Sequence, residues 1–117
     1  MAYRTFKDFN NGVKLVIDNA ISITYGERVL KAVYDSLLEH HGITSDEIPY
    51  RLDTLFKTIE DTVGTKNAFT LSRMIAKGVY ARMGLHFSEV EGYTLQDYME
   101  QLKKQLTLPD YRPPNEK

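Results

Sequence analysis

Hydrophobic residues recur at spacings of three and four along most of the chain, which is the periodicity of amphipathic α-helices. The first such segment covers about residues 8–24, and its apolar stripe comprises Phe6, Phe9, Val13, Val16, Ile17 and Ala20. Gly12 lies within this segment and weakens the helix by roughly 1 kcal/mol relative to alanine. Residues 13–17 are also compatible with a short strand, for which the chain offers no evident partner.

Three glycines divide the middle of the chain, because Gly42, Gly64 and Gly84 each follow a stretch of helical periodicity. Glycine readily adopts the left-handed conformation that ends a helix. We therefore predict helices over about residues 26–42, from Pro49 to 64, and over 67–83, with a short turn at 44–48. The apolar face of the second helix comprises Val29, Leu30, Val33, Tyr34, Leu37 and Leu38. The 67–83 segment has the widest apolar face, so we expect it at the centre of the fold.

A last helix is predicted to open with Thr94 and Asp97, whose spacing is that of a capping box with aspartate in the acidic position. Its narrow apolar seam consists of Leu95, Met99, Leu102 and Leu106. The chain then contains Pro109, Pro113 and Pro114, which cannot continue a helix. The expected fold is an all-α, compact bundle of about five helices, with a single domain over residues 1–107 and a flexible tail over 108–117.

Composition narrows the class of protein. A chain of 117 residues is one ordinary domain, and the absence of cysteine excludes disulfides and thiolate metal sites. The formal net charge of −1 disfavours nucleic acid as a partner, although a weak nucleic-acid binder stays an alternative. No apolar run is long enough for a membrane span, and the N-terminus lacks a signal-peptide pattern, so we expect a cytoplasmic protein without a membrane partner.

The spacing of the reactive residues does not match a known catalytic pattern. No Ser–His–acid arrangement or metal-ligand pattern is evident, so we predict a non-enzymatic protein with no catalytic residue, metal site or cofactor. A helix-turn-helix motif with Gly64 in the turn does not fit the sequence. The motif calls for a small residue four positions before the turn glycine, and this chain has the large Glu60 there. Asp53 and Asp61 are interpreted, with Glu60, as part of a solvated helix face.

Three polar residues are candidates for lining a ligand site or sensing pH. Tyr34 and Ser72 lie on apolar helix faces, where a polar group could orient a ligand between helices. The Ser72 hydroxyl is also expected to bond to the carbonyl four residues earlier. His41 ends the second helix, where the helix dipole also favours a histidine. These residues support the alternative function of a helical-bundle sensor for a small apolar ligand.

A second group of residues suggests an interface. Gly78 lies between Met74 and Ala81 on a side of the fourth helix separate from its main apolar face. Such small residues allow close approach of another helix, either from a second subunit or from the last helix of the same chain. Tyr98 joins them as a candidate exposed aromatic residue. The pattern favours a protein partner or self-association.

Several short stretches resemble a known family. They are residues 25–34, Gly42 with Ile43, 46–49, Gly64, Val79 with Tyr80, and 83–87. This series is similar to the small helical output or accessory domains of Nitrosopumilus-type archaeal signalling proteins, over about residues 26–87. The resemblance implies a role in signalling or regulation and supplies no catalytic residue. Our leading hypothesis is therefore a regulatory or protein–protein interaction module.

Overall fold

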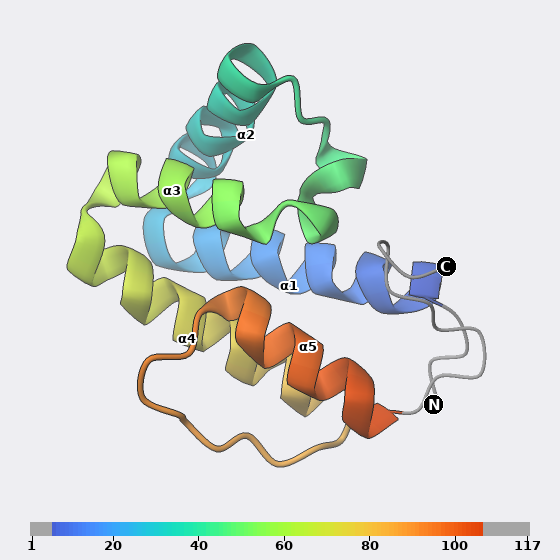
Figure 1. Ribbon diagram of the computed structural model, residues 1–117. Helices are drawn as coiled ribbons and strands as arrows, with labels where there is room; N and C mark the ends of the chain where they lie inside the picture. The colour runs from blue at the N-terminus through green and yellow to red at the C-terminus, as the bar shows by residue number, and fades with distance from the viewer. Residues whose placement is uncertain (1–5, 107–117) are drawn as a thin grey trace.

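The structure, a computed structural model, describes residues 6–106 (Figure 1). These residues form five α-helices and one 3₁₀ helix, with no strand among them: α1 (Phe6–Tyr25), α2 (Glu27–His41), η1 (Ser45–Tyr50), α3 (Leu52–Val63), α4 (Thr65–Arg82) and α5 (Leu95–Leu106). The predicted all-α fold is confirmed, and residues 13–17 are helical rather than a strand. The predicted tail, residues 108–117, lies outside the described part of the chain.

Helix α1 runs across the middle of the molecule, with α2 and α3 on one side and α4 and α5 on the other (Figure 1). Helix α4 contacts α1, α3 and α5, which confirms its expected central position. Its buried residues are Ala68, Leu71, Ser72, Ile75, Ala76, Val79 and Tyr80. One continuous core forms where α4 meets the buried stripe of α1, which consists of Phe9, Val13, Ile17 and Ile21.

Two glycines form the corners of the bundle, each as the single residue between two helices. Gly26 (φ 94°, ψ 169°) separates α1 from α2, and Gly64 (φ 93°, ψ 161°) separates α3 from α4. This backbone region is essentially restricted to glycine. Gly64 ends its helix as predicted, but the left-handed conformation expected there is wrong. The Gly64 N–H donates to the Glu60 carbonyl at the end of α3, and the Gly64 carbonyl accepts from the Ala68 N–H. Gly64 therefore also begins α4.

The expectation that Pro49 begins the third helix is wrong. Residues 45–50 form η1 with Pro49 inside it, and α3 begins only at Leu52. The reason lies upstream, where Thr44 and Glu47 form a reciprocal capping box that starts a helical turn before the proline. Arg51 (φ −130°, ψ 48°) then interrupts the helical backbone between η1 and α3.

The predicted start of α5 is confirmed in detail. The Thr94 N–H donates to Asp97 Oδ2 at 3.0 Å, and the Asp97 N–H donates to Thr94 Oγ1 at 3.1 Å. Leu95, Met99 and Leu102 of the predicted seam are buried. Leu38 departs from its prediction, because 54% of this side chain is exposed on α2, whose packing partners are α1 and α3.

Candidate ligand-binding groove

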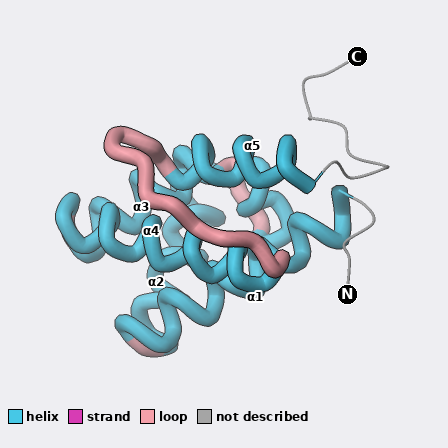
Figure 2. Tube along the Cα trace, turned by 90° about the horizontal axis from the view of Figure 1, so that it is seen from below, coloured by secondary structure: helices cyan, strands magenta, loops and turns pink. Residues whose placement is uncertain are grey.

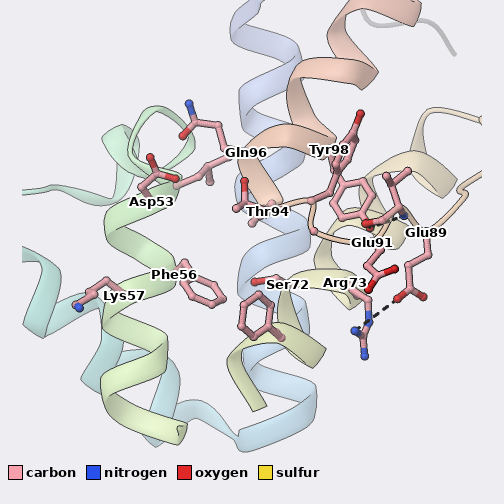
Figure 3. A pocket seen from close by; sticks show the side chains of 16 residues that line it. Asp53, Phe56, Lys57, Ser72, Arg73, Glu89, Glu91, Thr94, Gln96 and Tyr98 are labelled. Carbon is pink, nitrogen blue, oxygen red and sulfur yellow. Dashed lines mark hydrogen bonds and ion pairs between the residues drawn. The ribbon is translucent and has the colours of Figure 1, made fainter. Parts of the chain in front are cut away.

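A groove of about 650 Å³ lies between α3, α4 and residues 89–98 (Figure 3). We call it the aromatic groove, because four aromatic residues line it: Phe56, Phe69, Tyr93 and Tyr98. Phe56 and Phe69 meet edge to face with ring centroids 5.1 Å apart, across the corner that Gly64 makes. Tyr93 and Tyr98 form a second edge-to-face pair at 5.2 Å. The groove therefore has an aromatic pair on each of two walls.

The wall that carries Tyr93 belongs to the loop of residues 83–94, which joins α4 to α5. This loop lies on the outside of the molecule, on the side of α4 and α5 (Figure 1, Figure 2). The Phe87 ring anchors it by packing against Tyr80 and Tyr98, with centroid distances of 5.3 and 5.1 Å. The Tyr80 hydroxyl in turn donates to the Tyr98 carbonyl at 3.1 Å, and burial raises the pKa of Tyr80. These contacts fix the loop wall relative to α4 and α5.

Charged side chains surround the mouth of the aromatic groove. Asp53 and Lys57 come from α3, Arg73 comes from α4, and Glu89 and Glu91 come from the loop. An ion pair of 3.5 Å between Arg73 and Glu89 joins α4 to the loop. Both partners are about half exposed, so this pair contributes little to stability and is sensitive to salt.

Ser72 supplies a polar atom at the base of the aromatic groove. Its residue is 7% exposed, and its side chain lies between Phe56 and Arg73 in the close view (Figure 3). The bond expected from its hydroxyl to the carbonyl of residue 68 is not formed, and the hydroxyl has no hydrogen-bond partner among the described residues. A ligand that enters the groove therefore meets the Ser72 hydroxyl at its base, among apolar and aromatic groups.

The structure separates the other candidate ligand residues from Ser72. Tyr34 lies on α2, half-buried, and its hydroxyl donates to the Asp18 carboxylate of α1. The Lys14 ammonium lies 5.9 Å from the centroid of the Tyr34 ring and 3.1 Å from Asp18. His41 is exposed at the end of α2. Neither Tyr34 nor His41 lines the aromatic groove.

The four candidate interface residues also fall into two groups, those packed within the chain and those exposed on its surface. Tyr98 is wrong as an exposed contact residue, because it is 3% exposed and held by Phe87 and Val90. Gly78 packs within the chain, and the partner is α1 rather than the expected last helix. A Cβ atom at Gly78 would lie 2.8 Å from Cγ1 of Val16.

Met74 and Ala81 are exposed, as an interface residue must be. Met74 Sδ lies 4.0 Å from the Thr24 hydroxyl of α1.

A smaller cavity of about 370 Å³ lies between α1 and η1, where Asn10, Asn11 and Lys14 face Asp46 and Tyr50. Asn10 is 6% exposed, and its Nδ2 atom has no hydrogen-bond partner. Among side-chain nitrogen and oxygen atoms of the described residues that are themselves inaccessible to solvent, this amide nitrogen is the one without a hydrogen-bond partner. No sequence pattern indicates this cavity, because its residues come from two segments, 10–14 and 46–50, that meet only in the folded chain.

Sequence reasoning also missed most of the aromatic groove. Phe56 is partly buried against the core, and Phe69 lies on the polar side of α4, where it is 46% exposed. The signal that could have revealed it is an aromatic residue outside the apolar stripe, close to a one-residue helix corner. Of the candidate residues from the sequence, Ser72 and Tyr98 line this site, and Tyr98 was expected there as an interface residue and not as part of a groove.

Within residues 8–105, no group of three or more histidine or acidic side chains is placed to hold a metal ion. None of the helices described is long and apolar enough to cross a membrane. Comparisons of the chain with protein-family models, characterised proteins and solved structures find no match. The resemblance to archaeal output domains stays a prediction.

Proposed function

We propose that this chain is a non-enzymatic, cytoplasmic regulatory module that binds a small, mainly apolar molecule in the aromatic groove. The observation that carries the proposal is the groove itself, with its volume of about 650 Å³ and its aromatic walls. Sites for small molecules typically enclose about 300–1,000 Å³ and are lined by apolar groups with a few polar atoms. The Ser72 hydroxyl is such a polar atom.

The position of the groove explains how ligand binding would change the conformation of the loop. Its walls come from α3, α4 and the 83–94 loop, so a bound molecule would touch three separate parts of the fold. The loop is held by side-chain contacts rather than by regular secondary structure, and such segments open at low free-energy cost. A ligand that binds the closed loop more tightly than the open loop would shift this equilibrium. That shift is the output expected of a signalling accessory domain.

Heteronuclear NMR titration with neutral, anionic and cationic aromatic fragments tests the proposal. We expect the amide resonances of residues 52–57, 69–73 and 89–98 to move together for at least one fragment class. Phe69→Ala removes a half-exposed groove ring, and Leu38→Ala removes a comparably exposed side chain from α2 as the matched control. The first variant should weaken binding and the second should not. Equal effects of the two variants, or no shift at the groove with any fragment, would overturn the proposal.

A second candidate function is the interaction module favoured by the sequence. Ile23 on α1 is 81% exposed, and it precedes Thr24, which contacts the exposed Met74 of α4. Exposed apolar side chains on two packed helices are typical of a surface that associates. Light scattering of the wild type and of Ile23→Ser over a range of concentrations tests self-association. A wild-type mass that stays monomeric throughout counts against it.

A further inference from the structure

We infer that the aromatic groove selects an organic cation, one whose positive centre lies against the aromatic rings while its apolar part fills the groove. The inference rests on the proposed function and specifies the chemical class of its ligand. Two independent observations carry it. One is the concentration of aromatic rings in the groove, and the other is the balance of charge around its mouth.

Aromatic rings attract cations because the face of each ring carries partial negative charge. The Phe56–Phe69 pair lines one wall, and the Tyr93–Tyr98 pair lines the opposite one. Within each pair the rings are steeply inclined, at 60° and 67°. Phe69 is 46% exposed and Tyr93 is only partly buried, so each wall has one ring that a bound group can reach. Sites that recognise quaternary ammonium groups are built from several such rings.

The charges at the mouth add to this preference. Three carboxylates (Asp53, Glu89 and Glu91) face two cations, Lys57 and Arg73. Arg73 is engaged with Glu89 at 3.5 Å, whereas Asp53 and Glu91 form no ion pair among the described residues.

Asp53 and Lys57 lie one helical turn apart on α3, and both line the groove. Three carboxylates against two cations leave one negative charge in excess at the opening, and Glu91 is a carboxylate there without an ion-pair partner among the described residues. An anionic ligand would meet unpaired carboxylates there, and a cationic ligand would be attracted by them.

A matched series of ligands tests this inference. The cation is benzyldimethyl(hydroxyethyl)ammonium, the neutral compound is the alcohol in which carbon replaces its nitrogen, and the anion is the carboxylate formed by oxidising that alcohol. Their shapes are alike and their charges differ. We expect NMR titration to give a dissociation constant about five- to tenfold lower for the cation than for the neutral alcohol. The anion should bind most weakly of the three.

Two variants and one control separate the contribution of the aromatic rings to the preference for the cation from that of the carboxylates. Phe69→Leu keeps apolar volume but removes a ring, so it should reduce the preference for the cation more than the affinity for the neutral alcohol. Glu91→Gln should reduce the same preference and its dependence on salt. Glu39→Gln makes the same charge change at an exposed position of α2, away from the groove, and serves as the control. A preference for the cation that neither Phe69→Leu nor Glu91→Gln reduces would overturn the inference.

The outcomes also distinguish the inference from the proposed function. If the neutral alcohol or the anion binds in the groove as tightly as the cation, the inference is wrong and the proposed function stands. If none of the three compounds, and no fragment of any class, shifts the groove resonances, both are wrong. Cation binding that maps to α2 or η1 instead of the groove would also overturn the inference.

Discussion

The hydroxyl of Tyr98 is bonded to both backbone polar groups of Val90. It accepts a hydrogen bond from the Val90 N–H at 3.0 Å and donates one to the Val90 carbonyl at 3.2 Å. One buried side chain of α5 thus satisfies the Val90 N–H and shares the Val90 carbonyl with the Tyr93 N–H, which donates to it at 3.2 Å. Since Val90 and Tyr98 both line the aromatic groove, this pair ties the loop wall to the helical scaffold.

Tyr98→Phe is expected to loosen the loop while leaving the ring in place. The change removes two hydrogen bonds, and each contributes about 0.5–1.5 kcal/mol in a typical protein. Val90 is 41% exposed, so water replaces part of the loss and the unfolding free energy should fall by about 1 kcal/mol. Hydrogen exchange at the Val90 amide should accelerate markedly.

Tyr93→Phe is the matched control for this prediction, because the Tyr93 hydroxyl has no hydrogen-bond partner among the described residues. It should change neither stability nor exchange at Val90. Unaltered exchange at Val90 in Tyr98→Phe would show that the two hydrogen bonds do not hold the loop.

The fold was predictable where local chemistry decides it. The Thr94–Asp97 capping box and the left-handed Gly42 act within a few residues of sequence, and both are found as expected. The exposure of Tyr98 and the helix that packs against Gly78 were predicted wrongly for the same physical reason. Periodicity identifies a helix face but not the element that covers it. The loop buries Tyr98, and α1 covers Gly78.

The aromatic groove lay further beyond sequence reasoning, because its residues come from three segments that meet only in the folded chain. Phe56 and Phe69 are brought together by the sharp corner at Gly64, and no sequence pattern specifies the angle between the two helices. Ser72 was identified as a polar residue on an apolar face. Its place at the base of a cavity depends on the Phe56 and Phe69 rings leaving space above it.

Gly64→Ala is expected to destabilise the protein through the backbone alone. An added Cβ atom would have no neighbour within 4 Å, so no steric contact contributes. The cost arises because alanine strongly disfavours φ near 93° with an extended ψ, and it should amount to about 1–3 kcal/mol. Urea denaturation followed by circular dichroism measures it.

Gly42→Asn provides the contrast, because Gly42 (φ 64°, ψ 24°) is in the left-handed region that asparagine tolerates. That variant should lose less than about 1 kcal/mol. If Gly64→Ala proved as mild as Gly42→Asn, the corner would be relaxing into another conformation, and the Phe56–Phe69 contact should then change as well.

The free energy of unfolding should depend on pH through the Glu47 carboxyl group. Hydrogen bonds from the Thr44 backbone N–H and then from its hydroxyl lower the pKa of Glu47 from its ordinary value of 4.5. The folded state therefore binds fewer protons than the unfolded state in acid, so stability rises with pH there. The contribution is fully present above the unfolded pKa, and it disappears as the pH falls through the folded pKa.

Glu47→Gln removes this contribution. The variant should be less stable than the wild type at about pH 7, and the difference should vanish at about pH 3. Denaturation midpoints at both pH values check this, with Asp46→Asn as a neighbouring charge change. A difference between wild type and Glu47→Gln that is the same at both pH values would contradict the capping role.

The effect of Gly78→Ala on stability should change sign when Val16 is also replaced by alanine. In the wild type, Gly78→Ala places a Cβ atom 2.8 Å from Val16 Cγ1, and such overpacking costs about 1–3 kcal/mol. Alanine also improves helix propensity by about 1 kcal/mol, so the net change is expected to be destabilising. In a Val16→Ala background the clash is absent, and Gly78→Ala should stabilise by about 0.5–1 kcal/mol. Chemical denaturation of all four proteins gives the coupling energy, which we expect to exceed about 1 kcal/mol. A coupling near zero would mean that α1 and α4 separate readily, and the intramolecular explanation of Gly78 would then fail.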